Sequence, residues 1–146
     1  MNGADAAGRR RGREAALQML YQMEIGRASA HEAIATYWPA HDEDHELADP
    51  LREFANALVR GTIARMPEID AIITLHAQNW RIERMAVIDR LVLRLAVYEM
   101  LAEAATPPRV VINEAIEVAR TFSGDESVPF VNGVLDAVRK ELDPGT

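Results

Sequence analysis

The sequence from Met85 to Ala104 reads MAVIDRLVLRLAVYEMLAEA. On a helix of about 3.6 residues per turn, this stretch places apolar side chains on two opposite faces. One face holds Ile88, Leu91, Val92, Leu95 and Ala102, the other holds Leu93, Val97 and Met100, and the narrow seams between them hold Asp89, Arg90, Arg94 and Glu103. Because an apolar face must be covered, the pattern predicts a central helix with other helices packed on both of its sides.

Glu99 is the exception to this pattern, since it falls within the apolar face of Ile88 and Leu95. A carboxylate that is buried without a partner is costly. We therefore expect Glu99 to be hydrogen-bonded, paired with an arginine, or placed near an open end of that face.

The rest of the chain is predicted to form about six further helices. Their signals are, in chain order, helical spacing from Arg9 to Gly26, a capping box of Ser29 and Glu32 closed by Pro39, an N-cap and first position at Asp49 and Pro50, a start at Pro67, a restart at Pro107 and Pro108, and helical spacing from Val128 to Leu142. No stretch shows the sustained alternation of a β-strand. The sequence therefore predicts an all-α protein of about seven helices.

Length and composition exclude several classes of protein. The 146 residues suffice for one compact domain. The absence of cysteine excludes disulfides and Cys-ligated zinc. There is no apolar signal core and no window approaching about 18 uncharged apolar residues. We expect a cytoplasmic protein without a membrane span, with a disordered tail over residues 1–8 and a single helical domain over residues 9–142.

The charge is unevenly distributed along the chain. The formal net charge is −7, from 16 basic and 23 acidic residues. Residues 1–27 hold five arginines and three acidic residues, whereas the other 119 residues hold eleven basic and twenty acidic groups. Four arginines, Arg9, Arg10, Arg11 and Arg13, form what we call the arginine run. A concentrated positive segment on an acidic chain indicates a local site for a polyanion.

The arginine run is suited to RNA. Arginine offers a flat fork of donors that binds phosphate and stacks on bases. If the first helix already includes Arg10, then Arg10, Leu17 and Tyr21 lie nearly on one line along it, and we expect this line to be exposed. The run is expected to have no core face. The alternative is a basic tail that only improves solubility.

Signatures of enzymes and metal sites are missing from the sequence. There is no P-loop, no Rossmann glycine pattern and no G-x-S-x-G, so no catalysed reaction and no cofactor are predicted. His41 and His45 could hold a metal if helical, but H-E-x-x-H requires Glu where Asp42 stands, which favours a solvated acidic loop. For Asn113, Glu114 and Glu117 on the sixth helix we favour a structural role over acid–base chemistry.

Two residues of the last helix admit two interpretations. Phe130 lies at the rim of the apolar face, where its ring can pack inward or stack on a base; considered alone, it is assigned to the core. Gly133 lies inside the helix, where glycine lowers stability by up to about 1 kcal/mol relative to alanine. A glycine at such a position usually indicates that another part of the chain approaches the backbone closely.

Several motifs resemble the NusB family of bacterial transcription antitermination proteins. They are D-R-x-x-L-R-x-A-x-Y-E from Asp89, V-x-N-E-A-x-E-x-A from Val111, F-V-N-G-V-L from Phe130, and the amino-terminal R-R-R-x-R-E-x-A followed by Leu20 and Tyr21. The similarity covers nearly the whole chain and is weakest between Gly26 and Arg60. The F-V-N-G-V-L block after an N-E-A-I-E helix is specific, whereas the arginine run alone would not be.

The resemblance implies a fold and a function. The fold would be two perpendicular three-helix subdomains around a long central helix. The function would be binding of the boxA element of ribosomal RNA transcripts together with NusE, a protein of the small ribosomal subunit. Through these contacts the protein would join the RNA polymerase antitermination complex indirectly and support processive transcription of ribosomal RNA.

The resemblance also implies which residues contact RNA. Arg9, Arg10, Arg11 and Arg13 would contact phosphates and bases, Tyr21 and Phe130 would lie near bases, and Asp89 would lie at the edge of the site. The family's acidic loop pair is matched by Asp125 and Glu126, and we include Glu126 in the site. Where basic residues often precede the family's phenylalanine, this chain has Val128 and Pro129.

Two alternatives remain open. A related domain precedes an rRNA cytosine methyltransferase, which would require a catalytic domain with a cofactor fold and a cysteine nucleophile; neither is expected in these 146 residues. The other is a self-associating helical adapter that binds no RNA, since the resemblance also allows a homodimer. The adapter predicts that deleting residues 1–13 leaves every partner contact intact.

Overall fold

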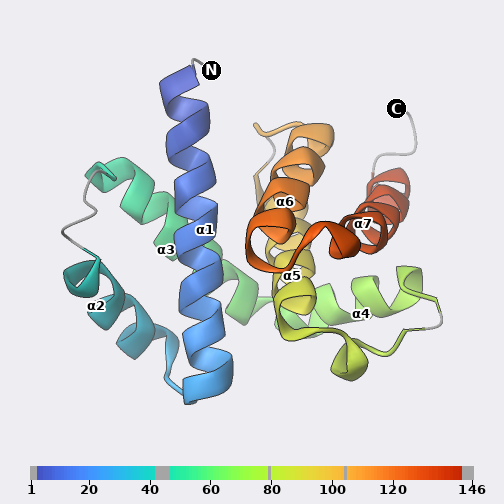
Figure 1. Cartoon of the computed structure of the whole chain (residues 1–146), viewed down its shortest axis with the longest axis horizontal. Coiled ribbons are helices and arrows are strands. Elements are labelled where there is room, and N and C mark those ends of the chain that lie inside the picture. The colour runs from blue at the N-terminus through green and yellow to red at the C-terminus, as the bar shows by residue number, and fades with distance from the viewer. Residues whose placement is uncertain (1–2, 42–46, 79, 104, 143–146) are drawn as a thin grey trace. The chain divides into compact units, whose positions relative to one another are not determined.

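The computed structural model describes residues 3–41, 47–78, 80–103 and 105–142 (Figure 1). Within these ranges there are seven α-helices and no strand, so the predicted all-α class is confirmed. The elements are α1 (Gly3–Gly26), α2 (Ala30–Ala40), α3 (Asp49–Ala64), α4 (Met66–His76), the 3-10 helix η2 (Ile82–Arg84), α5 (Val87–Ala102), α6 (Pro108–Phe122), the 3-10 helix η3 (Asp125–Ser127) and α7 (Val128–Leu142). No described helix combines the length and the apolar character needed to cross a bilayer.

The chain divides into two compact units, Met1–Ile63 and Ala64–Thr146. The sequence predicts one domain over residues 9–142, and each unit is described here by itself. The first unit contains α1, α2 and most of α3, and the second contains α4 to α7.

The first helix is longer than expected. It begins at Gly3, inside the stretch 1–8 for which the sequence predicts disorder. Gly8 is already buried, and a Cβ atom built on it would lie 2.4 Å from Cδ1 of Leu51 on α3. Packing against another helix stabilises a segment that is weak by intrinsic propensity, which explains the longer helix.

The capping box of α2 is confirmed. The hydroxyl of Ser29 accepts a hydrogen bond from the backbone N–H of Glu32 at 3.1 Å, and the Glu32 carboxylate accepts one from the backbone N–H of Ser29 at 3.2 Å. The bond from the Ser29 backbone N–H, and after it a hydrogen bond from the Ser29 side chain, lower the pKa of the Glu32 carboxyl. Pro39 lies inside the last turn instead of ending the helix before it, and α2 continues to Ala40.

Side-chain hydrogen bonds join the helices of the first unit. The Tyr37 hydroxyl on α2 donates to the Gln18 side chain on α1. The indole N–H of Trp38 donates to Oδ1 of Asn56 on α3 at 2.9 Å. Both bonds give a buried or half-buried polar group a partner, so α2 is fixed to each of its neighbours.

Helix α5 is the centre of the second unit. It packs against α4, α6 and α7. Its buried apolar residues include members of both predicted faces, together with Ala96, which is assigned to neither face. They are Leu91, Val92, Leu93, Leu95, Ala96 and Val97. The prediction of a helix that is apolar on two sides is therefore confirmed.

The polar residues of α5 are also accounted for. Arg94 donates to both carboxylate oxygens of Asp70 on α4, at 2.8 and 2.9 Å. Glu99 is only 2% exposed and is not without a partner, as expected for a carboxylate on an apolar face.

Candidate nucleic-acid interface

The arginine run divides into two pairs on α1. Arg10 and Arg11 are exposed, whereas Arg9 is half-buried and Arg13 is only 7% exposed. Residues four apart in a helix lie on the same face, so Arg9 and Arg13 share one face. The expectation that the run has no core face is therefore wrong.

Phe54 on α3 is the reason for this division. The guanidinium carbon of Arg9 lies 4.1 Å from the centre of the Phe54 ring, and that of Arg13 lies 5.4 Å from it. Both distances fall within the range of cation–π attraction. Gly12 makes the approach possible, because a Cβ atom there would lie 3.0 Å from Cδ2 of Phe54. Arg9 and Arg13 thus pack within their own unit.

The line through Arg10, Leu17 and Tyr21 is exposed only at its two ends. Tyr21 is 43% exposed and Arg10 is exposed, but Leu17 is 1% exposed, which contradicts the prediction for that residue. Arg10 and Tyr21 are eleven residues apart, about 16 Å along the helix at about 1.5 Å per residue. Neighbouring elements cover only part of so long a helix, so exposure changes along a single line.

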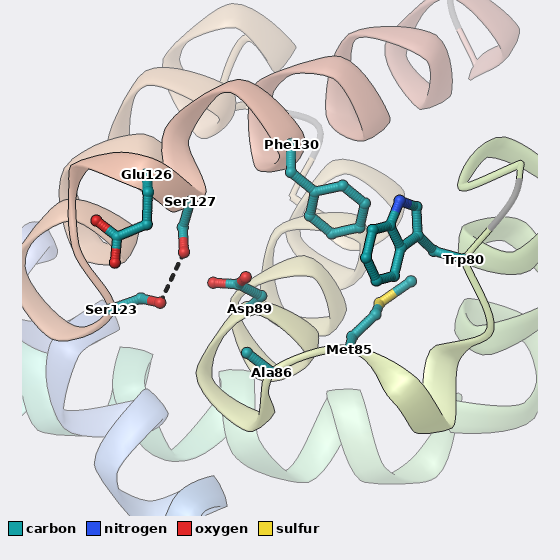
Figure 2. Close-up of a pocket in the computed structure, with 8 residues that line it drawn as sticks. All are labelled: Trp80, Met85, Ala86, Asp89, Ser123, Glu126, Ser127 and Phe130. Carbon is teal, nitrogen blue, oxygen red and sulfur yellow. Dashed lines mark hydrogen bonds between the residues drawn. The ribbon is translucent and has the colours of Figure 1, made fainter.

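The second unit contains a pocket that joins three of the predicted site residues (Figure 2). Its volume is about 490 Å³. The residues that line it are Trp80, Met85, Ala86, Asp89, Ser123, Glu126, Ser127 and Phe130. We call it the Phe130 pocket. Asp89 comes from the start of α5, Glu126 from η3 and Phe130 from α7, so the pocket brings together side chains that are distant in sequence.

An aromatic pair forms one side of the Phe130 pocket. The Trp80 and Phe130 rings lie edge to face, with centroids 5.9 Å apart and an interplanar angle of 66°. Phe130 is half-buried and Trp80 is 54% exposed. The isolated assignment of Phe130 to the core is therefore wrong, because the ring lines a cavity. Trp80 is not among the predicted site residues, although a tryptophan between α4 and α5 next to several arginines is a signal.

The other side of the pocket is polar. The Ser123 and Ser127 hydroxyls are hydrogen-bonded to each other at 2.7 Å. The Asp89 side chain is 9% exposed, and its Oδ1 is buried without a hydrogen-bond partner among the described residues. Asp89 is the third residue of α5, where a negative charge is favoured by the positive end of the helix dipole. The position at the start of α5 therefore suits an acidic residue, but Oδ1 of Asp89 still has no hydrogen-bond partner among the described residues.

The two acidic residues of the loop after α6 have different roles. Asp125 accepts a hydrogen bond from Nε of Arg120 at 3.0 Å, and Arg120 also pairs with Glu117. The bond to Glu117, followed by the one to Asp125, raises the pKa of Arg120. Glu117 thus takes part in a surface ion pair with Arg120. Glu126 instead lines the pocket.

Gly124 leaves room for the side chain of Glu126. Its φ angle is +131°, in the region that favours glycine, and a Cβ atom there would lie 2.7 Å from both carboxylate oxygens of Glu126. The Glu126 carboxylate therefore lies directly over a glycine, and any side chain at residue 124 would displace it.

A second cavity, of about 400 Å³, shares the aromatic pair. Trp80, Phe130, His76, Gln78 and Gly133 are among its lining residues. No atom lies within 4 Å of a Cβ built on Gly133, outside its neighbours and its own helix backbone. No described part of the chain thus makes the close approach that the sequence predicts at Gly133.

The remaining candidate concerns metal binding. His45 and Asp42 of the acidic loop lie outside the described residues, so that alternative has no structural counterpart here. Across the described ranges, no group of three His, Asp or Glu side chains is placed to hold a metal ion.

Comparison with known proteins places the chain in a class of transcription factors. The model of the NusB family matches residues 10–140. A transcription antitermination protein NusB from Koribacter versatilis is 49% identical over 92% of this chain and 90% of its own length, and one from Solibacter usitatus is 48% identical over 93% and 91%. The chain belongs to the NusB family, whose members are named for a role in transcription and not for a catalysed reaction.

Solved structures agree with this assignment. NusB of T. maritima is 37% identical, covers 91% of both chains and gives a TM-score of 0.79. A chain from a complex of the antitermination factors NusB and NusE with double-stranded RNA is 26% identical, covers 92% of this chain and 98% of its own, and gives a TM-score of 0.80.

Proposed function

We propose that this protein is a non-catalytic, cytoplasmic factor that binds the boxA element of ribosomal RNA transcripts together with NusE. In this role it joins the RNA polymerase antitermination complex indirectly and supports processive transcription of ribosomal RNA. The observation that supports the proposal best is the Phe130 pocket, which gathers Asp89, Glu126 and Phe130 in a chain of the NusB family.

The exposed surface of α1 suits the phosphates of a single strand. Arg10 and Arg11 are exposed residues, and the guanidinium of an arginine can bind phosphate with two hydrogen bonds. Tyr21, on the same helix, exposes a ring on which a base can stack. Arg9 and Arg13 add positive potential, but their contact with Phe54 limits how far they can reach.

The Phe130 pocket suits a base. Aromatic side chains stack on unpaired bases, and base edges are read by hydrogen bonds. Trp80 and Phe130 supply the rings. Asp89 and the hydrogen-bonded Ser123 and Ser127, which we call the serine pair, supply polar atoms. Phosphate contacts would then supply affinity and the pocket would supply sequence preference.

NusE provides the second contact of the proposed assembly. Each contact alone can be modest, because joining RNA and NusE on one protein raises the effective concentration of each for the other. The relative that was solved with NusE and RNA supports this pairing by analogy.

A gel-shift series tests the proposal. Labelled boxA-like RNA and a scrambled strand of equal composition are titrated with the protein, with and without NusE. We expect tighter binding of the boxA-like RNA and a further gain when NusE is added. Equal binding of both strands with NusE present would refute sequence recognition. Binding of NusE without any RNA binding would favour the adapter instead.

A further inference from the structure

The Phe130 pocket has an aromatic side and an acidic side that face one ligand space (Figure 2). Trp80, Phe130 and Met85 form the first side, and Asp89, Glu126 and the serine pair form the second. Such a pocket fits a flat molecule with apolar faces and hydrogen-bond donors on one edge.

The Asp89 carboxylate determines which hydrogen-bond donors a ligand of this pocket must carry. In Figure 2 its carboxylate lies between the serine pair and the Phe130 ring. A buried carboxylate oxygen without a donor is unfavourable, since it has lost water and gained nothing in return. Rotation about the last side-chain bond is soft, so either oxygen can turn toward a ligand. A ligand with two adjacent N–H groups would pair both oxygens at once.

The serine pair adds one donor to the pocket. Two hydroxyls carry two O–H groups, and one of these is used in the 2.7 Å bond between Ser123 and Ser127. The other O–H remains for an acceptor. The polar side of the pocket therefore offers a carboxylate that accepts two hydrogen bonds and a hydroxyl that can donate one.

We propose that the Phe130 pocket selects guanine, with Asp89 accepting hydrogen bonds from its N1–H and N2–H groups and the serine pair donating to its O6. This inference rests on the proposed RNA-binding function and adds the identity of the base. The guanine ring packs against the aromatic pair.

The other three bases lack this arrangement of donors. Adenine, cytosine and uracil each present one donor group beside a ring nitrogen or carbonyl acceptor on the same edge. An acceptor that faces the Asp89 carboxylate is repelled by it. Glu126 adds negative charge to the same pocket, which disfavours a phosphate there and favours a base.

The first test needs no variant. Short uridine-rich RNAs carry guanine, inosine, adenine or cytosine at one central position, and fluorescence anisotropy gives the dissociation constant of each for the wild-type protein. We expect guanine to be preferred over adenine and cytosine by about tenfold or more, as for a good bidentate pair. Inosine keeps N1–H but lacks the N2 amino group, so its affinity should lie in between.

The second test assigns the preference to Asp89. Asp89→Asn should bring the guanine-to-inosine ratio close to one, because the amide cannot accept hydrogen bonds at both side-chain positions. Asp125→Asn is the matched control, because it makes the same charge change in a residue that pairs with Arg120 and does not line the pocket. It should keep the wild-type ratio.

The outcomes separate this inference from the proposed function. Equal binding of the four RNAs by the wild-type protein overturns guanine selection, even when boxA-like RNA still binds in the gel shift. Failure of boxA-like RNA to bind with NusE present refutes the function itself. If the Asp89→Asn protein no longer binds NusE but keeps its base preference, the pocket binds a guanidinium of the protein partner. That result would also overturn the proposal.

Discussion

The two units offer opposite chemistry to a ligand. The first has two exposed arginines, Arg10 and Arg11, on α1. The second holds the carboxylate of Asp89 in a pocket beside Trp80 and Phe130. Cations on an open surface attract any phosphate chain, but acceptors beside rings discriminate between bases. Under the proposed function, affinity for RNA would therefore depend on the first unit and selectivity on the second.

The units also use glycine differently. Gly12 permits the approach of Phe54 to α1, and its replacement would push a Cβ atom to 3.0 Å from that ring. Gly133 has nothing near its missing side chain and borders the second cavity. A glycine in the first unit therefore serves packing, while the packing of the second unit requires no glycine at Gly133.

Phe54→Ala should give the largest change in stability, and it tests the role of the Phe54 ring in the first unit. The variant removes a half-buried ring and its contacts with Arg9 and Arg13, so we expect the free energy of unfolding to fall by about 2–3 kcal/mol. Chemical denaturation monitored by circular dichroism measures this change. A loss below about 0.5 kcal/mol, typical of an ordinary surface site, would show that the ring does not hold the two arginines.

Phe130→Ala is the matched variant in the second unit. Its ring is also half-buried, but it lines a cavity. We expect the loss of the Trp80 contact to cost only about 1 kcal/mol of stability. RNA binding should weaken by about 1–3 kcal/mol, as for loss of one stacked base. If Phe130→Ala destabilised the fold as much as Phe54→Ala, the two rings would have the same role.

Arg10→Ala with Arg11→Ala tests the phosphate side of the comparison. Each arginine that neutralises one phosphate contributes roughly −0.7 to the slope of log K against log salt concentration for a single strand. The double variant should therefore reduce the steepness of that slope by about 1.4, with little change in stability because both side chains are exposed. Anisotropy titrations over a range of salt concentrations give the slope.

Arg60→Ala is the control for that experiment, since Arg60 is an exposed arginine of α3 in the same unit. It should leave the slope unchanged. If Arg60→Ala reduced the slope as much as the loss of Arg10 or Arg11 is expected to, then net charge, and not the arginine run, would govern RNA affinity.

Much of this molecule follows from the sequence for identifiable reasons. Helical periodicity and the capping box of Ser29 and Glu32 are local signals, and both are confirmed. The two-faced pattern of α5 predicts its burial. The family motifs also place Asp89, Glu126 and Phe130 in one site, and the structure brings these three together in one pocket.

The incorrect predictions share a physical cause. The division of the arginine run depends on Phe54, which is more than forty residues away in sequence. Leu17 lies on the predicted exposed line but is buried, because coverage along α1 depends on tertiary packing. Trp80 becomes part of the site only through the ring of Phe130. Such long-range contacts have no local periodic signal.

Gly133→Ala sharpens the contrast between the two glycines. Because no described atom opposes the added methyl group, alanine should stabilise α7 by up to about 1 kcal/mol. Thermal and chemical denaturation measure the gain. Gly12→Ala is the matched change in the first unit and should be neutral or destabilising, because Phe54 must move. A destabilised Gly133→Ala protein would show that the backbone there is closely approached after all.

Glu126→Gln should give the smallest change, and it separates repulsion from recognition in the Phe130 pocket. The substitution removes one negative charge near the proposed RNA path while keeping the shape of the side chain. If the carboxylate acts only by repulsion, RNA should bind slightly more tightly, by up to about 1 kcal/mol for an exposed charge. Anisotropy with the guanine-containing strand measures this change. Weaker binding would mean that Glu126 accepts a hydrogen bond from a base. The acidic side of the pocket would then contain two acceptors that recognise the base, and Asp89 would not be sufficient for selectivity.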